Sequence, residues 1–75
     1  MEETIIEIMK DVLDEQDINI DSTQDSLENW NSLRHLNLVS ELEDEFDVEF
    51  EPEEIAEMKS VKAILELINT KKSEV

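Results

Sequence analysis

One uninterrupted stretch decides the fold of this chain: NSLRHLNLVSELEDEFD, which runs from Asn31 to Asp47 without glycine or proline. Its apolar residues recur at helical spacing and predict a helix from Ser32 to Phe46. Asn31 is suited to cap the start, because its side chain can accept a bond from an unpaired backbone N–H. At about 100° per residue, the inward face carries Leu36, His35, Val39, Leu42, Phe46 and Leu38, and Leu33 falls on the polar face.

Three further helices are expected around this one. Residues 3–13 form an amphipathic pattern, in which Thr4 and Glu7 suggest a capping box. Residues 14–29 lose the pattern and predict a long loop, anchored by Ile18, Ile20 and Leu27. Pro52 marks the start of a short third helix. Ser60 is expected to cap a fourth, whose inward stripe is Val61, Ile64, Leu65 and Ile68, and residues 73–75 are expected to fray.

Length and charge set the class of protein. The chain has 75 residues, 22 acidic against 6 basic side chains, a net charge of -16, one histidine and no cysteine. A chain this short makes one domain, residues 1–75, with a small core. The acidity opposes nucleic-acid and anionic-membrane binding and favours basic protein partners. The chain shows no membrane-spanning or signal-peptide pattern, so we expect it in the cytoplasm. We also expect it to be a monomer.

Catalytic and metal-binding hypotheses find little support. Ser32 and His35 are close enough for a serine hydrolase, but the chain lacks a Gly-x-Ser-x-Gly elbow and an obvious oxyanion hole. Residues 44–49 alternate acids but lack the glycine of a calcium-binding loop. We therefore expect no catalytic residue and no metal site.

Ser32 stands out because of its place at the start of the long helix. A phosphate ester there would meet free N–H groups and the positive end of the helix dipole. The apolar Leu33 and the acids further along would suit a basic docking surface. The candidate docking residues are Leu33, Asn37, Ser40, Glu41, Glu43 and Asp44. Trp30 is expected to plug the loop against the bundle, and contact with a group on Ser32 is the alternative.

These residues resemble the acyl carrier protein family. The resemblance rests on Asn31-Ser32-Leu33, on Leu36 and Leu38-Val39, and on residues 42–50, and it covers nearly the whole chain. It implies an antiparallel four-helix bundle with a short third helix, and 4′-phosphopantetheine on Ser32 beside the cap Asn31. It also implies acyl thioesters for fatty-acid, lipid or polyketide synthesis. The implied partners are a phosphopantetheinyl transferase and acyl-transferring and chain-elongating enzymes. An acyl chain would lie against Val39, Leu42, Phe46, Ile55 and Ile64, which are equally suited to be core residues.

The sequence departs from the family pattern at two places, and it contains a second serine tripeptide that resembles the attachment site, which we call the decoy. Asn31 stands where the family usually has Asp, and Arg34 and His35 follow the serine, which favours a specialised carrier. Asp25-Ser26-Leu27 spells the usual tripeptide, but no amphipathic helix follows Ser26 directly. The carrier would be free-standing. The competing class is an acidic module that binds its partner without a covalent group, such as a regulatory adaptor or a nucleic-acid mimic.

Overall fold

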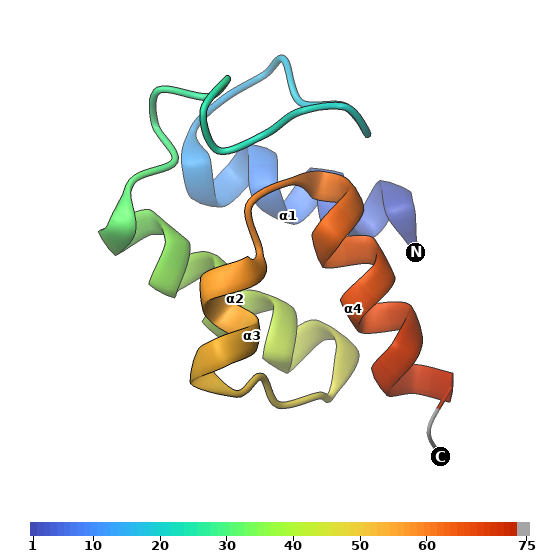
Figure 1. The fold of residues 1–75 in the computed structure, drawn as a ribbon. Helices are drawn as coiled ribbons and strands as arrows, with labels where there is room; N and C mark the ends of the chain where they lie inside the picture. Colours follow the sequence, from blue (N-terminus) through green and yellow to red (C-terminus); the bar gives the residue numbers. More distant parts are fainter. Residues whose placement is uncertain (74–75) are drawn as a thin grey trace.

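Four helices make up the part of the protein that the structure describes, as expected. The structure, a computed structural model, describes residues 1–73 and contains α1 (Glu2–Leu13), α2 (Ser32–Phe46), α3 (Pro52–Glu57) and α4 (Val61–Ser73) (Figure 1). Within the described residues there is no strand, only an isolated bridge between Thr23 and Ser60. The fraying expected at residues 73–75 concerns Ser73, the last residue of α4, and two residues outside the described part. The all-α prediction is confirmed.

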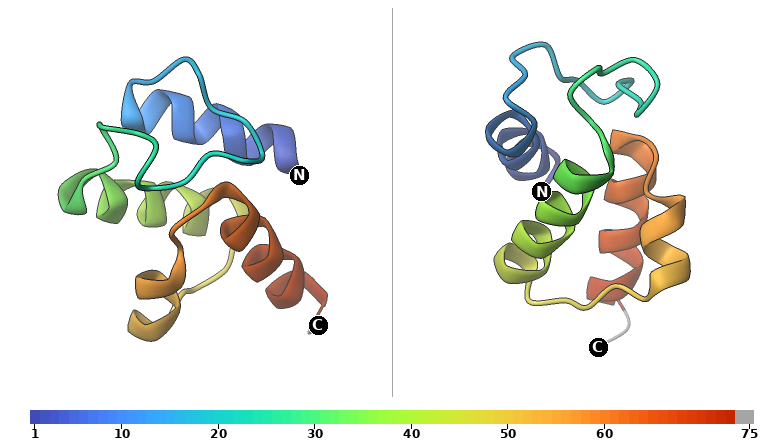
Figure 2. Two further views of the ribbon diagram at one scale, coloured as in Figure 1. Left: turned by 45° about the horizontal axis from the view of Figure 1, so that its top comes forward. Right: turned by 90° about the vertical axis from the view of Figure 1, so that its left-hand side faces the viewer.

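The helices share one hydrophobic core. α1 runs opposite to α2 and packs mainly against it, and it also touches α4 (Figures 1 and 2). Short helices are only marginally stable alone in water, so these helices depend on the burial of their apolar faces. The fully buried side chains come from α1, α2, α4 and the cap of α3: Ile5, Met9, Leu13, Leu38, Leu42, Met58, Val61, Ile64 and Ile68. α3 itself contributes no buried residue within its six positions.

The two long helices before α3 begin differently. Asn31 Oδ1 accepts the Arg34 N–H at 2.9 Å, so the predicted cap of α2 is confirmed, and so are both ends of that helix. The capping box expected from Thr4 and Glu7 is wrong. α1 already begins at Glu2, and the Ile5 N–H bonds to the Met1 carbonyl, so Thr4 lies inside the helix instead of before it.

The predicted starts of α3 and α4 are confirmed. Pro52 is the first residue of α3, where its missing N–H costs no hydrogen bond. A reciprocal pair of bonds between Glu51 and Glu54 completes that end as a capping box. Ser60 Oγ accepts the Ala63 N–H at 3.0 Å and so caps α4. In the stripe of α4, Leu65 is half-buried.

The long loop between α1 and α2 is held at several points. Ile18, Leu27 and Trp30 are buried in the core, and Ile20 is half-buried against it. Two backbone bonds join the loop to the turn before α4: the Gln24 N–H donates to the Lys59 carbonyl at 2.8 Å, and the Val61 N–H donates to the Ser22 carbonyl at 3.1 Å. The anchored loop therefore holds Asn31 in a fixed position at the start of α2.

Candidate functional site

Ser32 is the first residue of α2, and its side chain is exposed. The Asn31 side chain accepts a hydrogen bond from the Arg34 N–H, one of the N–H groups at this helix end that have no partner within the helix. The N–H groups of Ser32 and Leu33 have no acceptor among the residues that the structure describes. The hydroxyl thus stands at the positive end of a helix of 15 residues, with free donors beside it.

The electrostatics of this helix end suit an anion. Although the chain carries a net charge of -16, no acidic residue lies in the first turn of α2. That turn holds Arg34, whose guanidinium donates to the Val12 carbonyl in the last turn of α1 at 3.3 Å. A phosphate ester on Ser32 would therefore meet N–H donors, and no carboxylate of the same turn would repel it.

Other serines are placed differently. Ser26, the decoy, lies in a turn where its Oγ accepts the Thr23 N–H and donates to the Thr23 carbonyl, both at 2.9 Å. Ser22 is buried, and its Oγ accepts the Asn19 N–H at 3.0 Å. Ser60 caps α4. Ser40 is exposed but lies in the middle of α2, where the backbone N–H groups are used within the helix. Ser32 alone among these five combines exposure with a helix start.

His35 is fully engaged and cannot act as a base for Ser32. The Trp30 Nε1–H donates to His35 Nδ1 at 2.9 Å, and His35 Nε2 lies 2.8 Å from the Ile55 carbonyl oxygen. Trp30 is only 3% exposed, which confirms that it plugs the loop against the bundle. The bond to Ile55 was missed from the sequence, because that residue is 20 positions away.

The expected docking residues share the outer face of α2, with one exception. Asn37, Ser40, Glu41 and Asp44 are exposed, and Leu33 is 71% exposed. Glu43 is half-buried, and its carboxylate accepts the Phe50 N–H at 2.8 Å, so it is tied to the fold.

Leu36 was wrongly assigned to the inward face. It is 58% exposed, and it lies about 120° from the buried Leu42 around the helix, at the edge of the face that the sequence pattern assigned to the interior. Leu33, Leu36 and Ser40 instead form an outward stripe that begins beside Ser32.

Comparison with known families decides the class of protein. The family model for the phosphopantetheine attachment site matches residues 3–68. The chain belongs to the phosphopantetheine-binding carrier family. A comparison with curated proteins found no match.

Family membership assigns the cofactor and the broad role. The carrier holds 4′-phosphopantetheine covalently, and carriers of this kind interact with a phosphopantetheinyl transferase and with synthase enzymes. Carrier domains are not themselves catalytic. The free N–H groups at Ser32 and the absence of acids from that turn fit a phosphodiester there.

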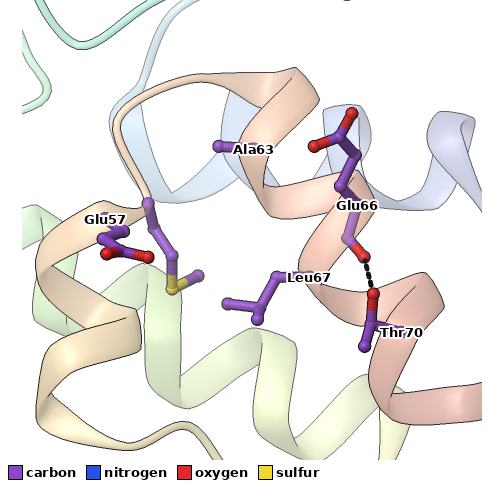
Figure 3. A pocket seen from close by; sticks show the side chains of 6 residues that line it. Glu57, Ala63, Glu66, Leu67 and Thr70 are labelled. Atoms are coloured by element: carbon purple, nitrogen blue, oxygen red, sulfur yellow. Dashed lines mark hydrogen bonds between the residues drawn. The ribbon is translucent and has the colours of Figure 1, made fainter.

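The interior of the carrier is closed at the expected acyl-binding residues. Leu42 and Ile64 have no exposed surface, Val39 is buried, and Phe46 and Ile55 are half-buried. An open cavity of about 280 Å³ lies elsewhere, between the end of α3 and α4 (Figure 3). None of the five expected residues lines it; its lining is Glu57, Met58, Ala63, Glu66, Leu67 and Thr70.

Two lysines near the end of α4 hold the segment between α2 and α3. Lys71 pairs with Glu54 at 2.8 Å and lies over the ring of Phe50, and Lys72 Nζ donates to the Phe46 carbonyl at 2.9 Å. The Glu51 N–H bond and the Lys71 ammonium hold the pKa of Glu54 below its ordinary value. This end of the carrier is thus braced by charge as well as by packing.

The described part of the carrier has neither a cluster of metal ligands nor a membrane-spanning helix. No three histidine, cysteine or acidic side chains there are grouped so that they could hold a metal ion. No helix there has the length and apolar character that crossing a membrane requires.

Proposed function

We propose that Ser32 bears the 4′-phosphopantetheine arm and that the protein carries acyl intermediates for fatty-acid synthesis or for a specialised lipid or polyketide pathway. The observation that supports this most is the placement of Ser32: an exposed hydroxyl at the capped start of α2. The arm supplies a terminal thiol, on which an acyl group is held as a thioester. The chain has no cysteine, so no side chain of its own competes for the acyl group.

Each residue around Ser32 has a definite part in this proposal. Asn31 fixes the first turn of α2 through its bond to the Arg34 N–H, which orients the hydroxyl outward. The N–H groups of Ser32 and Leu33 would face the phosphate of the arm. A base that accepts the proton of the Ser32 hydroxyl would come from the transferase, because His35 has no free nitrogen.

The outer face of α2 is the proposed docking surface for the enzymes. An apolar stripe of Leu33 and Leu36 next to exposed acids would suit a partner with an apolar contact inside a basic rim. Of the expected residues we retain Leu33, Asn37, Ser40, Glu41 and Asp44, and we leave out Glu43 because its carboxylate is bound to Phe50.

An acyl chain would enter between α2 and α3. Phe46, the last residue of α2, and Ile55 of α3 are half-buried against the core, to which Val39, Leu42 and Ile64 belong. α3 has no buried residue of its own, so moving it would expose less apolar surface than moving any other helix. The monomeric state and the cytoplasmic location stay predictions.

Coexpression with a broad-specificity phosphopantetheinyl transferase tests the attachment site. Intact-mass and peptide mass spectrometry should find one phosphopantetheine on the peptide that contains Ser32. Ser32→Ala should abolish the adduct, and Ser26→Ala, the matched control in the decoy tripeptide, should keep it. An adduct on Ser26 would contradict the site. A Ser32→Ala chain that keeps full cellular function would instead support the acidic interaction module.

A further inference from the structure

The bonds of His35 define its protonation state. An indole N–H can only donate, and a carbonyl oxygen can only accept. Because His35 lies between the Trp30 Nε1–H and the Ile55 carbonyl, its Nδ1 must accept and its Nε2 must carry the proton. The imidazole is therefore neutral and held in one tautomer. Its ring also lies against the indole, with the ring centres 5.9 Å apart.

This bridge joins three segments around Ser32. Trp30 ends the long loop two residues before Ser32, His35 follows it by one helical turn, and Ile55 belongs to α3. α3 is held to the rest of the protein at few points. None of its six residues is buried, although Ile55 packs against the core and the cap residue Met58 is buried. Its first turn is held by the Glu54–Lys71 pair at the far end of α2. Among the described residues, the His35–Ile55 bond is the hydrogen bond that joins α3 to the end of α2 that carries Ser32.

An enzyme that acts on Ser32 must cover more than one turn of α2. An ordinary interface takes about 800 Å² from each partner. The whole carrier exposes 4960 Å², so such a patch is about a sixth of its surface. Since His35 holds α3 one helical turn from Ser32, a patch of this size reaches α3.

Resting on the proposed attachment at Ser32, we propose that His35 is a positioning residue for arm transfer: it fixes α3 where the phosphopantetheinyl transferase contacts it. His35 does not touch the reacting atoms in this role. It acts through the Ile55 carbonyl and depends on the Trp30 N–H to hold its tautomer. Its loss should therefore weaken recognition of the carrier and leave the chemical step unchanged.

The test compares three carriers in steady-state loading with a phosphopantetheinyl transferase and saturating coenzyme A. His35→Phe keeps a ring but no bond, and His35→Gln supplies an amide N–H for the Ile55 carbonyl. We expect His35→Phe to raise the KM for the carrier about fivefold and to leave kcat unchanged, because a fivefold change corresponds to the loss of one hydrogen bond. His35→Gln should bring the KM most of the way back to that of the unsubstituted carrier. If His35→Phe does not fold, His35→Leu replaces it.

Two spectroscopic measurements separate positioning from general destabilisation. Amide exchange should become about fivefold faster in α3 of His35→Phe, with α1 and α4 unchanged. Imidazole ¹⁵N shifts of the unsubstituted carrier should show the Nε2–H tautomer. An unchanged KM, equal faster exchange in all helices, or the Nδ1–H tautomer would each overturn the role of His35. If the unsubstituted carrier took no arm at Ser32, the proposed function would fail, and this role with it.

Discussion

Replacing Asn31 by alanine should lower the free energy of unfolding by about 1 kcal/mol. The substitution removes the Oδ1 acceptor that lies 2.9 Å from the Arg34 N–H and leaves that donor to water. Loss of an N-cap side chain costs about 0.5–2 kcal/mol, and the exposure of Asn31 places this case near the middle. In a chain of 75 residues, about 1 kcal/mol shifts the melting temperature by roughly 4–8 °C.

Urea denaturation followed by circular dichroism measures this change. Ser32→Ala is the matched control, because the neighbouring side chain is truncated while the cap remains; it should stay within about 0.5 kcal/mol of the unsubstituted protein. Asn31→Asp should keep the stability, because a carboxylate also caps and favours the positive helix end. If Asn31→Ala and Ser32→Ala unfold at the same urea concentration, or if Asn31→Asp loses as much as Asn31→Ala, the capping account is refuted.

Other changes test the core, the Glu54 pair and the net charge. Leu42→Ala should cost about 2–5 kcal/mol of unfolding free energy, whereas Leu36→Ala should cost less than about 0.5 kcal/mol, because only Leu42 is buried; equal urea midpoints would refute this assignment of the α2 faces. The bond from the Glu51 N–H and the Lys71 ammonium hold the folded-state pKa of Glu54 below its ordinary value, so its ionised form stabilises the fold at neutral pH and the contribution is lost as the pH falls through the folded value. Glu54→Gln should thus melt below the unsubstituted protein at pH 7, and the gap should close in acid; a gap that widens there would contradict the pairing. Added sodium or magnesium chloride should raise the melting temperature by screening a net charge of -16, and no rise in either salt would contradict self-repulsion.

Local signals predicted most helix boundaries. Both ends of α2 were correct because Asn31 caps its start and the apolar pattern ends at Phe46. Pro52 and Ser60 marked their helix starts for equally local reasons. The C-terminal ends had a weaker signal. The chain has no glycine, and the left-handed cap positions after α1 and α2 are taken by Asp14 and Asp47, which tolerate that conformation better than most residues.

What the sequence could not predict depends on contacts between segments. Leu36 lies at the edge of the α2 face, where only the position of the neighbouring helices decides exposure. The two partners of His35 come from the loop and from α3, and helical periodicity carries no information on either. Glu43 was read as a surface acid because nothing local shows that it accepts the Phe50 N–H. The placement of Ser32 was predicted correctly, and its modification stays a prediction.

The bonds that join the long loop to the turn before α4 have a consequence for the order of folding. Gln24 and Ser22 find their partners at Lys59 and Val61, so the loop cannot become ordered until the last third of the chain has arrived. Helices form from local contacts within microseconds, whereas such distant pairings are slow. We therefore expect α1 and α2 to gain helicity first and the Ser32 end of α2 to become fixed last. During synthesis, a transferase would meet its finished target only after α4 has left the ribosome.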